Sequence, residues 1–97
     1  MGVRTANVQP GNIGETLEGL AATIHARRDA SPETSYTDEL LKKIAEEASE
    51  VIMACKDDDH DHIRYEAGDL VYHLLVILER YGVTLDELAG ELNARMK

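Results

Sequence analysis

Two acidic pairs are the residues of this sequence best suited to do chemistry. Glu47 and Glu50 form the first pair, Glu66 and Asp69 form the second, and the members of each pair are three positions apart. Side chains at this spacing lie on the same face of an α-helix, so each pair is expected to point in one direction. If two neighbouring helices carry the pairs, the carboxylates converge, and a hard divalent cation such as Mg²⁺ relieves their mutual repulsion. We therefore predict Glu47, Glu50, Glu66 and Asp69 as magnesium ligands.

A magnesium ion at such a site polarises a phosphoryl oxygen and activates water, so the predicted chemistry is attack of water on a phosphoanhydride. The catalytic candidates are Glu46, Glu47 and Glu50, because one carboxylate near the water would act as general base. The sequence does not separate a general base from a ligand. The competing interpretation is that the pairs mark solvated helix faces, as charge runs usually do. Apolar segments follow Glu50 and Asp69 directly, and charges beside buried segments need partners, which favours the metal site.

Five further residues are candidates for binding a phosphorylated substrate: Lys43, Arg28, Tyr36, Arg64 and His73. Lys43 would contact phosphate as a point charge, or it would pair with Glu47 four residues later. His73 follows Asp69 by four residues and would orient that carboxylate, touch phosphate, or serve as a hydrogen-bonded core histidine. Tyr36 would stack on a base or pack locally. His60 and His62 lie in the acidic run 57–61 and its edge, where polar residues are expected without any metal.

The elements that position these residues are helices. Apolar residues recur at three- and four-residue spacing, and the pattern predicts an all-α domain with helices over residues 15–28, 37–56, 61–81 and 84–96. Residues 1–14 have no apolar period and are expected to form a flexible tail, which leaves residues 15–97 as the domain. Gly82 is expected to end the third helix, and Thr84 with Glu87 forms a capping box for the fourth.

Both central helices carry an apolar stripe, and the second of them carries more apolar surface than a four-helix chain can cover. The stripe of the helix over residues 37–56 keeps three- and four-residue spacing and consists of Leu41, Ile44, Ala45, Ala48, Val51, Ile52 and Cys55, and Cys55 is expected to fill the core. Residues 70–78 of the next helix are apolar almost all round. A helix of this kind is buried on most sides. We therefore predict a helical bundle that is completed by homodimerisation.

Charge and cysteine content exclude several classes of partner. The net charge of −9 argues against nucleic acid and against an anionic membrane, because both need clustered Lys and Arg. The single cysteine allows no intrachain disulfide, which fits a cytoplasmic protein. No apolar run is long enough to span a membrane.

Three segments together resemble a known family, that of the phosphoribosyl-ATP pyrophosphatases. The pairs Glu47-x-x-Glu50 and Glu66-x-x-Asp69, with 15 residues between them, are the hallmark of the MazG-like all-α nucleotide pyrophosphohydrolases. The stretch from Arg27 to Thr37 is similar to the segment that leads into the Ser-Tyr-Thr motif of the phosphoribosyl-ATP branch. The run Asp69-Leu-Val-Tyr-His-Leu-Leu-Val is similar to a second signature of that branch, and Lys43 begins its lysine-led acidic motif. The resemblance covers the chain from Leu17 onward.

The resemblance implies a specific reaction. Members of the family hydrolyse phosphoribosyl-ATP between its α and β phosphates, giving phosphoribosyl-AMP and pyrophosphate in the second step of histidine biosynthesis. It also implies a magnesium requirement and a dimeric helical bundle. In one respect the chain departs from the pattern, because the segment between Thr37 and Glu46 is about two helical turns shorter than usual.

Two alternatives remain open on the sequence. A general MazG-like pyrophosphatase acting on nucleoside or deoxynucleoside triphosphates would carry the same acidic pairs. A non-catalytic helical module would use them as an interaction surface. A di-iron carboxylate bundle is disfavoured, because no glutamate is followed by histidine three residues later.

Overall fold

The chain folds into four α-helices, as the apolar periodicity predicts. The computed structural model describes residues 5–30 and 37–97, and for residues 28–30 and 37 it describes the backbone alone. The helices are α1 (Ile13–Ala30), α2 (Thr37–Lys56), α3 (His60–Arg80) and α4 (Leu85–Arg95), and the described residues contain no strand. None of these helices is long and apolar enough to cross a membrane. The all-α prediction is confirmed, and each predicted boundary lies within two residues of the observed one.

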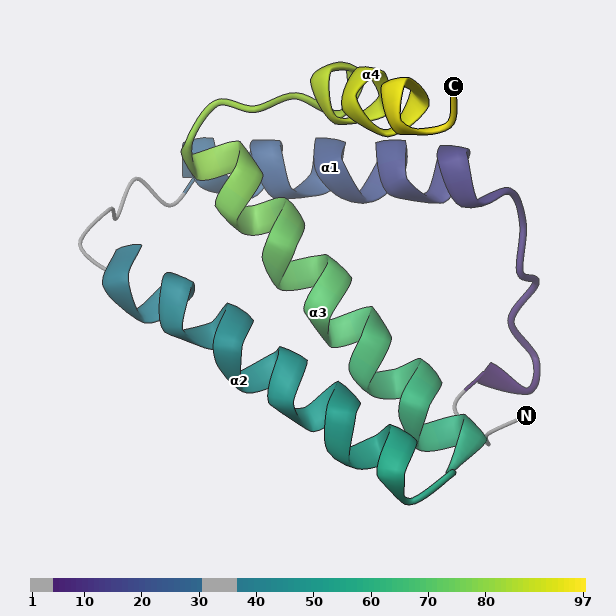
Figure 1. Ribbon diagram of the computed structural model, residues 1–97. Helices are drawn as coiled ribbons and strands as arrows, with labels where there is room; N and C mark the ends of the chain where they lie inside the picture. The colour runs from purple at the N-terminus through teal and green to yellow at the C-terminus, as the bar shows by residue number, and fades with distance from the viewer. Residues whose placement is uncertain (1–4, 31–36) are drawn as a thin grey trace.

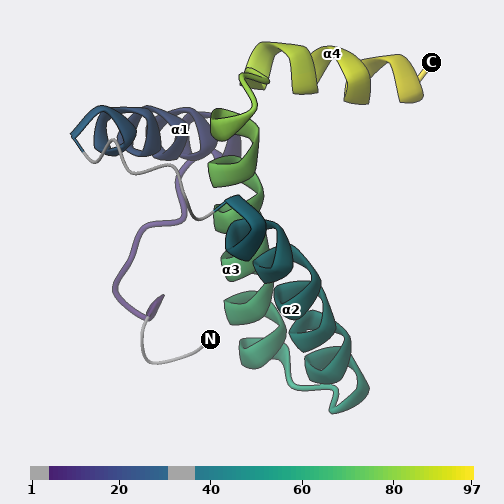
Figure 2. The same ribbon diagram turned by 90° about the vertical axis from the view of Figure 1, so that its left-hand side faces the viewer.

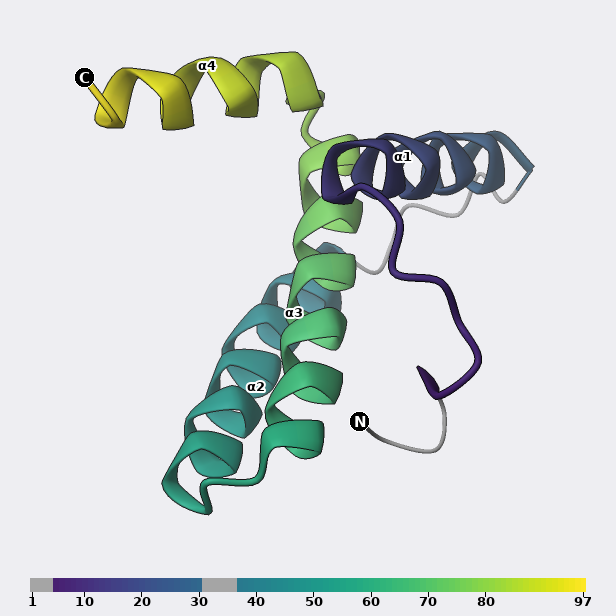
Figure 3. The same cartoon turned by 90° about the vertical axis from the view of Figure 1, so that its right-hand side faces the viewer.

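Most contacts between helices join α2 to α3, which run side by side in opposite directions (Figure 1). α1 packs across the C-terminal part of α3 and makes the second set of contacts. α4 leaves the end of α3 on the side opposite to α1 (Figures 2 and 3), and none of its residues is buried. The framework of the described chain is therefore an α2–α3 hairpin with α1 laid across one end.

Local hydrogen bonds explain where α1 and α3 begin. Asn12 precedes α1, and its side-chain Oδ1 accepts a bond from the backbone N–H of Glu15 at 3.1 Å. This cap starts α1 at Ile13, two residues before the predicted start. Asp59 caps α3 in the same way and accepts from the backbone N–H of His62 at 3.1 Å. The cap replaces the intrahelical bond that this N–H group lacks, so the turn after α2 leads directly into α3.

The connection between α3 and α4 is defined at both ends. Gly82 has φ +75°, a left-handed conformation that glycine adopts at little cost. The N–H of Gly82 donates to the carbonyl of Glu79, and the N–H of Val83 donates to that of Leu78, which is the Schellman pattern. Thr84 Oγ1 then accepts from the N–H of Glu87, and the Glu87 carboxylate accepts from the N–H of Thr84. Both predicted signals, Gly82 and the Thr84–Glu87 capping box, are confirmed.

The apolar stripe predicted for α2 is divided between two faces. Ile44, Ala48 and Val51 are half-buried against the rest of the chain, while Leu41, Ala45, Ile52 and Cys55 are exposed. The prediction that Cys55 fills the core is wrong for the single chain, because the neighbouring Ala54 occupies the buried position. The buried face of α2 instead carries Glu47, which is only 4% exposed. A charged side chain therefore lies where the helical period would place an apolar one.

The capping box gives a prediction for α4. Thr84→Ala removes the acceptor for the Glu87 N–H and should cost α4 about 1 kcal/mol. Because α4 has no buried residue, the loss should be local, with faster hydrogen exchange of α4 amides and little change in the melting temperature. Thr23→Ala is the matched control, since the Thr23 hydroxyl bonds only to the carbonyl of Gly19 within α1. Unchanged exchange in α4 would show that the box does not hold the helix.

Candidate metal site

Three of the predicted metal ligands meet at the contact between α2 and α3. Glu47 of α2 and Glu66 and Asp69 of α3 each offer a carboxylate oxygen, and these oxygens lie within 4.8 Å of one another. Glu47 and Glu66 are buried, at 4% and 7% exposure, and Asp69 is half-buried. Three carboxylates at this separation in a poorly hydrated contact repel one another strongly. Such a group is stable when a cation lies between its members.

Each buried carboxylate has one oxygen with a neighbour and one without. Oε2 of Glu47 lies 3.5 Å from Nζ of Lys43 and 3.8 Å from Nδ1 of His73. Oε2 of Glu66 lies 2.9 Å from Nε2 of His62. The Oε1 atoms of both glutamates are buried and have no hydrogen-bond partner among the described residues. A buried acceptor without a partner costs free energy, and oxygen ligands are those that Mg²⁺ and similar hard cations take.

Glu50 and Glu46 lie outside this group. Both side chains are exposed, and neither contributes to the described set of converging oxygens. Glu46 lies 3.9 Å from Nζ of Lys43, so this lysine sits between Glu46 and Glu47 along one side of α2. Residues three apart differ by about 60° around a helix axis, which is enough to separate a buried Glu47 from an exposed Glu50. Whether Glu50 binds metal stays a prediction.

The predicted substrate-binding residues differ in how close they lie to the carboxylate cluster. Lys43 lies beside the cluster, at 3.5 Å from Glu47. His73 is half-buried, and its Nδ1 donates to the backbone carbonyl of Asp69 at 2.8 Å, which leaves Nε2 as an acceptor in the neutral ring. Its ring meets that of Tyr72 edge to face, with centroids 5.3 Å apart. The side chain of Arg28 and the whole of Tyr36 lie outside the described residues.

Arg64 has a partner of its own at the start of α3. Its Nη2 donates to Oδ1 of Asp61 at 2.8 Å, and this hydrogen bond holds the pKa of Asp61 below its ordinary value. Asp61 is exposed, so the pair is screened by water and contributes little to folding. An arginine already bonded to a carboxylate must exchange that partner to bind phosphate. The structure therefore gives the predicted role of Arg64 no direct support.

His62 belongs to the site although the sequence interpretation set it aside. It precedes Glu66 by four positions, and its Nε2 lies 2.9 Å from Oε2 of Glu66, which is the shortest side-chain contact that the described residues make with a carboxylate of the cluster. The signal was present in the i,i+4 spacing of His62 and Glu66. This spacing was overlooked because His62 lies next to the acidic run 57–61, and polar residues in a turn need no functional explanation.

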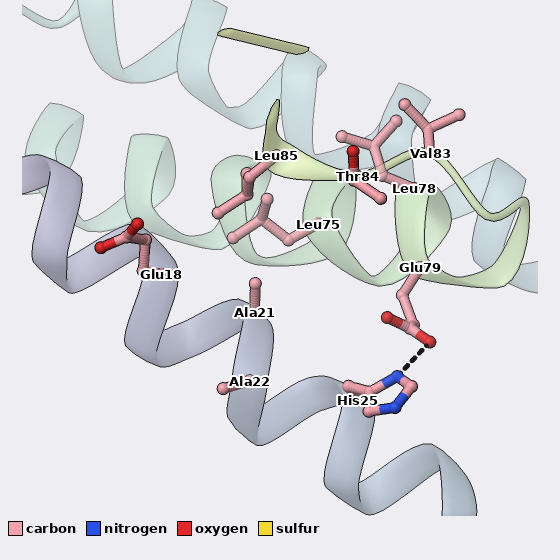
Figure 4. Close-up of a pocket in the computed structure, with 10 residues that line it drawn as sticks. All are labelled: Glu18, Ala21, Ala22, His25, Leu75, Leu78, Glu79, Val83, Thr84 and Leu85. Atoms are coloured by element: carbon pink, nitrogen blue, oxygen red, sulfur yellow. Dashed lines mark hydrogen bonds and ion pairs between the residues drawn. The ribbon is translucent and has the colours of Figure 1, made fainter. Parts of the chain in front are cut away.

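A hollow of about 300 Å³ lies elsewhere, where α1 crosses α3 (Figure 4). Its wall is mostly apolar and includes Ala21, Leu75 and Val83, and the pair His25–Glu79 lies at its edge with Nδ1 and Oε2 2.9 Å apart. None of the clustered carboxylates lines it. The hollow therefore offers mainly apolar contact area, and the two carboxylates that line it, Glu18 and Glu79, do not belong to the described cluster.

Comparison with known proteins identifies the family. The family model for phosphoribosyl-ATP pyrophosphohydrolase matches residues 17–96, which include every residue of the cluster. A phosphoribosyl-ATP pyrophosphatase of Nitrosomonas eutropha is 45% identical over 87 residues, covering 81% of this chain and 74% of the relative. One of Azoarcus sp. is 42% identical over 89 residues, covering 84% and 83%. A histidine biosynthesis bifunctional protein of Caldanaerobacter subterraneus is 42% identical over 91 residues, covering 86% of this chain and 44% of the relative.

The length of these alignments agrees with the shortened segment noted in the sequence. Each alignment spans more positions than the number of residues of this 97-residue chain that it covers. The relatives therefore carry additional residues within the aligned region. The first two relatives are covered over most of both chains at this level of identity, and the family model matches residues 17–96, so the membership is shown. The chain belongs to the phosphoribosyl-ATP pyrophosphohydrolase family.

Proposed function

We propose that this protein hydrolyses phosphoribosyl-ATP to phosphoribosyl-AMP and pyrophosphate, as the second step of histidine biosynthesis in the cytoplasm. The observation that carries the proposal is the buried cluster of Glu47, Glu66 and Asp69, found in a chain whose relatives are named for this reaction. Water adds to one phosphorus of the α–β anhydride, the P–O bond between the two phosphates breaks, and pyrophosphate leaves. The free thiol of Cys55 fits a reducing compartment.

We propose Mg²⁺ as the cation of this site. The donor set fits, because every ligand atom is a carboxylate oxygen and two buried oxygens of Glu47 and Glu66 have no hydrogen-bond partner in the part of the chain that the structure describes. Glu47, Glu66 and Asp69 would hold the ion, with Glu50 as the fourth predicted ligand. When bound, magnesium supplies charge stabilisation for the phosphate oxygens and a water of lowered pKa.

The protein's own groups then have distinct tasks. Lys43, 45% exposed beside Glu47, reaches both the cluster and solvent and is suited to contact a substrate phosphate. His73 is fixed by its bond to the Asp69 carbonyl and presents Nε2 as an acceptor. Glu46 and Glu50 stay the candidate general bases, since their exposed carboxylates lie one turn apart on the solvent side of Glu47.

The first prediction of the proposed function concerns activity. Purified protein should release pyrophosphate from phosphoribosyl-ATP in the presence of Mg²⁺ and stop when a chelator removes it. Glu66→Gln should lower kcat/KM by at least roughly 100-fold, because even outer partners of metal ligands are worth 10–100-fold. Glu91→Gln, an exposed glutamate of α4, is the matched control and should act as wild type.

A substrate panel separates this proposal from the general nucleotide pyrophosphatase. Phosphoribosyl-ATP is expected to be the preferred substrate over nucleoside and deoxynucleoside triphosphates in kcat/KM. Preference for the triphosphates would reject the specific assignment and point to the shortened segment after Thr37 as its cause. No hydrolysis of any of them by a folded, metal-bound protein would favour the non-catalytic module.

The buried charges give a second prediction. In the absence of divalent cations, Glu47→Gln should raise the free energy of unfolding by roughly 1–3 kcal/mol, since it removes one of several like charges about 5 Å apart. Added Mg²⁺ should raise the melting temperature of the wild type and have little effect on the variant. Glu91→Gln should respond to Mg²⁺ as the wild type does. A variant less stable than the metal-free wild type would contradict the repulsion argument.

We also propose that the chain functions as a homodimer. Val71 and Leu74 are each 40% exposed, and their spacing places them on one face of α3, while Tyr81, which follows the helix as its C-cap, is 57% exposed. The exposed half of the α2 stripe adds Leu41 and Ile52, at 43% and 56%. These apolar faces flank the described hairpin, and burying them against a second copy would supply the core that one chain lacks.

The third prediction tests this interface. Val71→Glu would place a charge in the proposed contact and should weaken the dimer by roughly tenfold or more, which corresponds to 1.4 kcal/mol. Val8→Glu makes the same change at a residue 61% exposed before α1 and should leave association unchanged. Sedimentation velocity over a range of concentrations measures both. A monomeric wild type, or equal behaviour of the two variants, would reject this interface.

A further inference from the structure

We propose that His62 is a positioning residue of the cation site, which holds one oxygen of Glu66 so that the other is presented to the metal. The inference rests on the proposed metal-binding function of the cluster. It assigns a task to a side chain that lies at the edge of the acidic turn and that contributes no oxygen ligand itself. The contact that carries it joins Nε2 of His62 to Oε2 of Glu66 at 2.9 Å.

The chemistry of the two groups fixes the direction of this hydrogen bond. An ionised carboxylate only accepts, so Nε2 of His62 must carry the proton and donate it. The lone pair of Nε2 is then absent, and this nitrogen cannot bind a metal while it holds Glu66. The arrangement therefore assigns His62 to orientation of a ligand and excludes it as a ligand through Nε2.

The bond divides the two oxygens of Glu66 between different tasks. Oε2 faces His62, whose side chain is 45% exposed, and Oε1 is buried without a hydrogen-bond partner among the described residues. Leaving Oε1 in this position costs free energy unless a cation occupies the space beside it. A freely rotating carboxylate would exchange the two oxygens. The bond from His62 opposes that rotation and leaves the buried Oε1 as the oxygen available to a cation.

His62 is itself well anchored for this role. Its backbone N–H donates to Oδ1 of Asp59, the residue that caps α3, and Glu66 lies four positions later on the same face of the helix. By contrast, the neighbours of Glu47 are longer contacts, at 3.5 Å for Lys43 and 3.8 Å for His73. Glu66 is therefore the carboxylate whose orientation the chain determines most tightly. Replacing the imidazole leaves the backbone cap in place, so the helix start should survive the change.

The experiment compares three variants of the full chain by titration with Mg²⁺ in a calorimeter and with Mn²⁺ by electron paramagnetic resonance. His62→Ala should weaken cation binding roughly tenfold, as removal of an outer partner of a metal ligand does. His62→Gln, which retains a terminal N–H donor, should recover most of the affinity. His60→Ala removes an exposed histidine two residues earlier and should bind as wild type does.

The outcomes separate this inference from the proposed function. If wild-type protein binds Mg²⁺ and hydrolyses phosphoribosyl-ATP while His62→Ala binds with unchanged affinity, the positioning role is wrong and the function stands. If the wild type binds neither cation, both are overturned. Nitrogen modulation in the pulsed Mn²⁺ spectrum of the wild type, lost in His62→Ala, would show a directly bound imidazole and would also reject the positioning role.

Discussion

The burial of like-charged carboxylates between α2 and α3 is the physical constraint on which the rest of the structure depends. Glu47 and Glu66 occupy positions that the helical period would give to apolar residues, and the described chain buries only Ile24, Ala54 and Leu75 as apolar residues. So small an apolar core offsets little electrostatic repulsion, because the free energy of unfolding is a small difference between large opposing contributions. The hairpin that makes most of the interhelical contacts is therefore the element that the cation site strains most.

The two central helices must serve several surfaces at once. One face of α2 meets α3 at the carboxylates, and another exposes Leu41 and Ile52. α3 has three faces with different surroundings. Glu66 faces α2, Leu75 contacts α1, and Val71 and Leu74 are exposed. The apolar residues of segment 70–78 therefore belong to two faces, one that contacts α1 and one that is exposed in the single chain, while Glu66 and Asp69 lie toward α2.

Helix existence, type and caps were predictable from the sequence because they depend on local signals. The Gly82 turn and the Thr84–Glu87 box need only the residues that form them. Which face of α2 is buried could not be predicted, because its apolar stripe is wide enough to cover two faces. Only packing against α3 determines which of the two is buried. For the same reason Glu47 and Glu50 separated, and Cys55 lay on the exposed side. The role of His62 was missed because the prediction considered this histidine with the acidic run that precedes it and not with Glu66, one turn later in α3.

Residues 57–59 are the whole connection between α2 and α3, and Asp58 adopts φ +55° within it. All three clustered ligands come from the two helices that this turn joins. Chain entropy therefore contributes little to the cost of assembling the site, because closing so short a loop restricts few conformations. Contacts this local in sequence also form quickly during folding. The three carboxylates can therefore come together early in folding, before α1 packs against α3. A metal ion can then bind and stabilise the α2–α3 hairpin before the rest of the chain has folded.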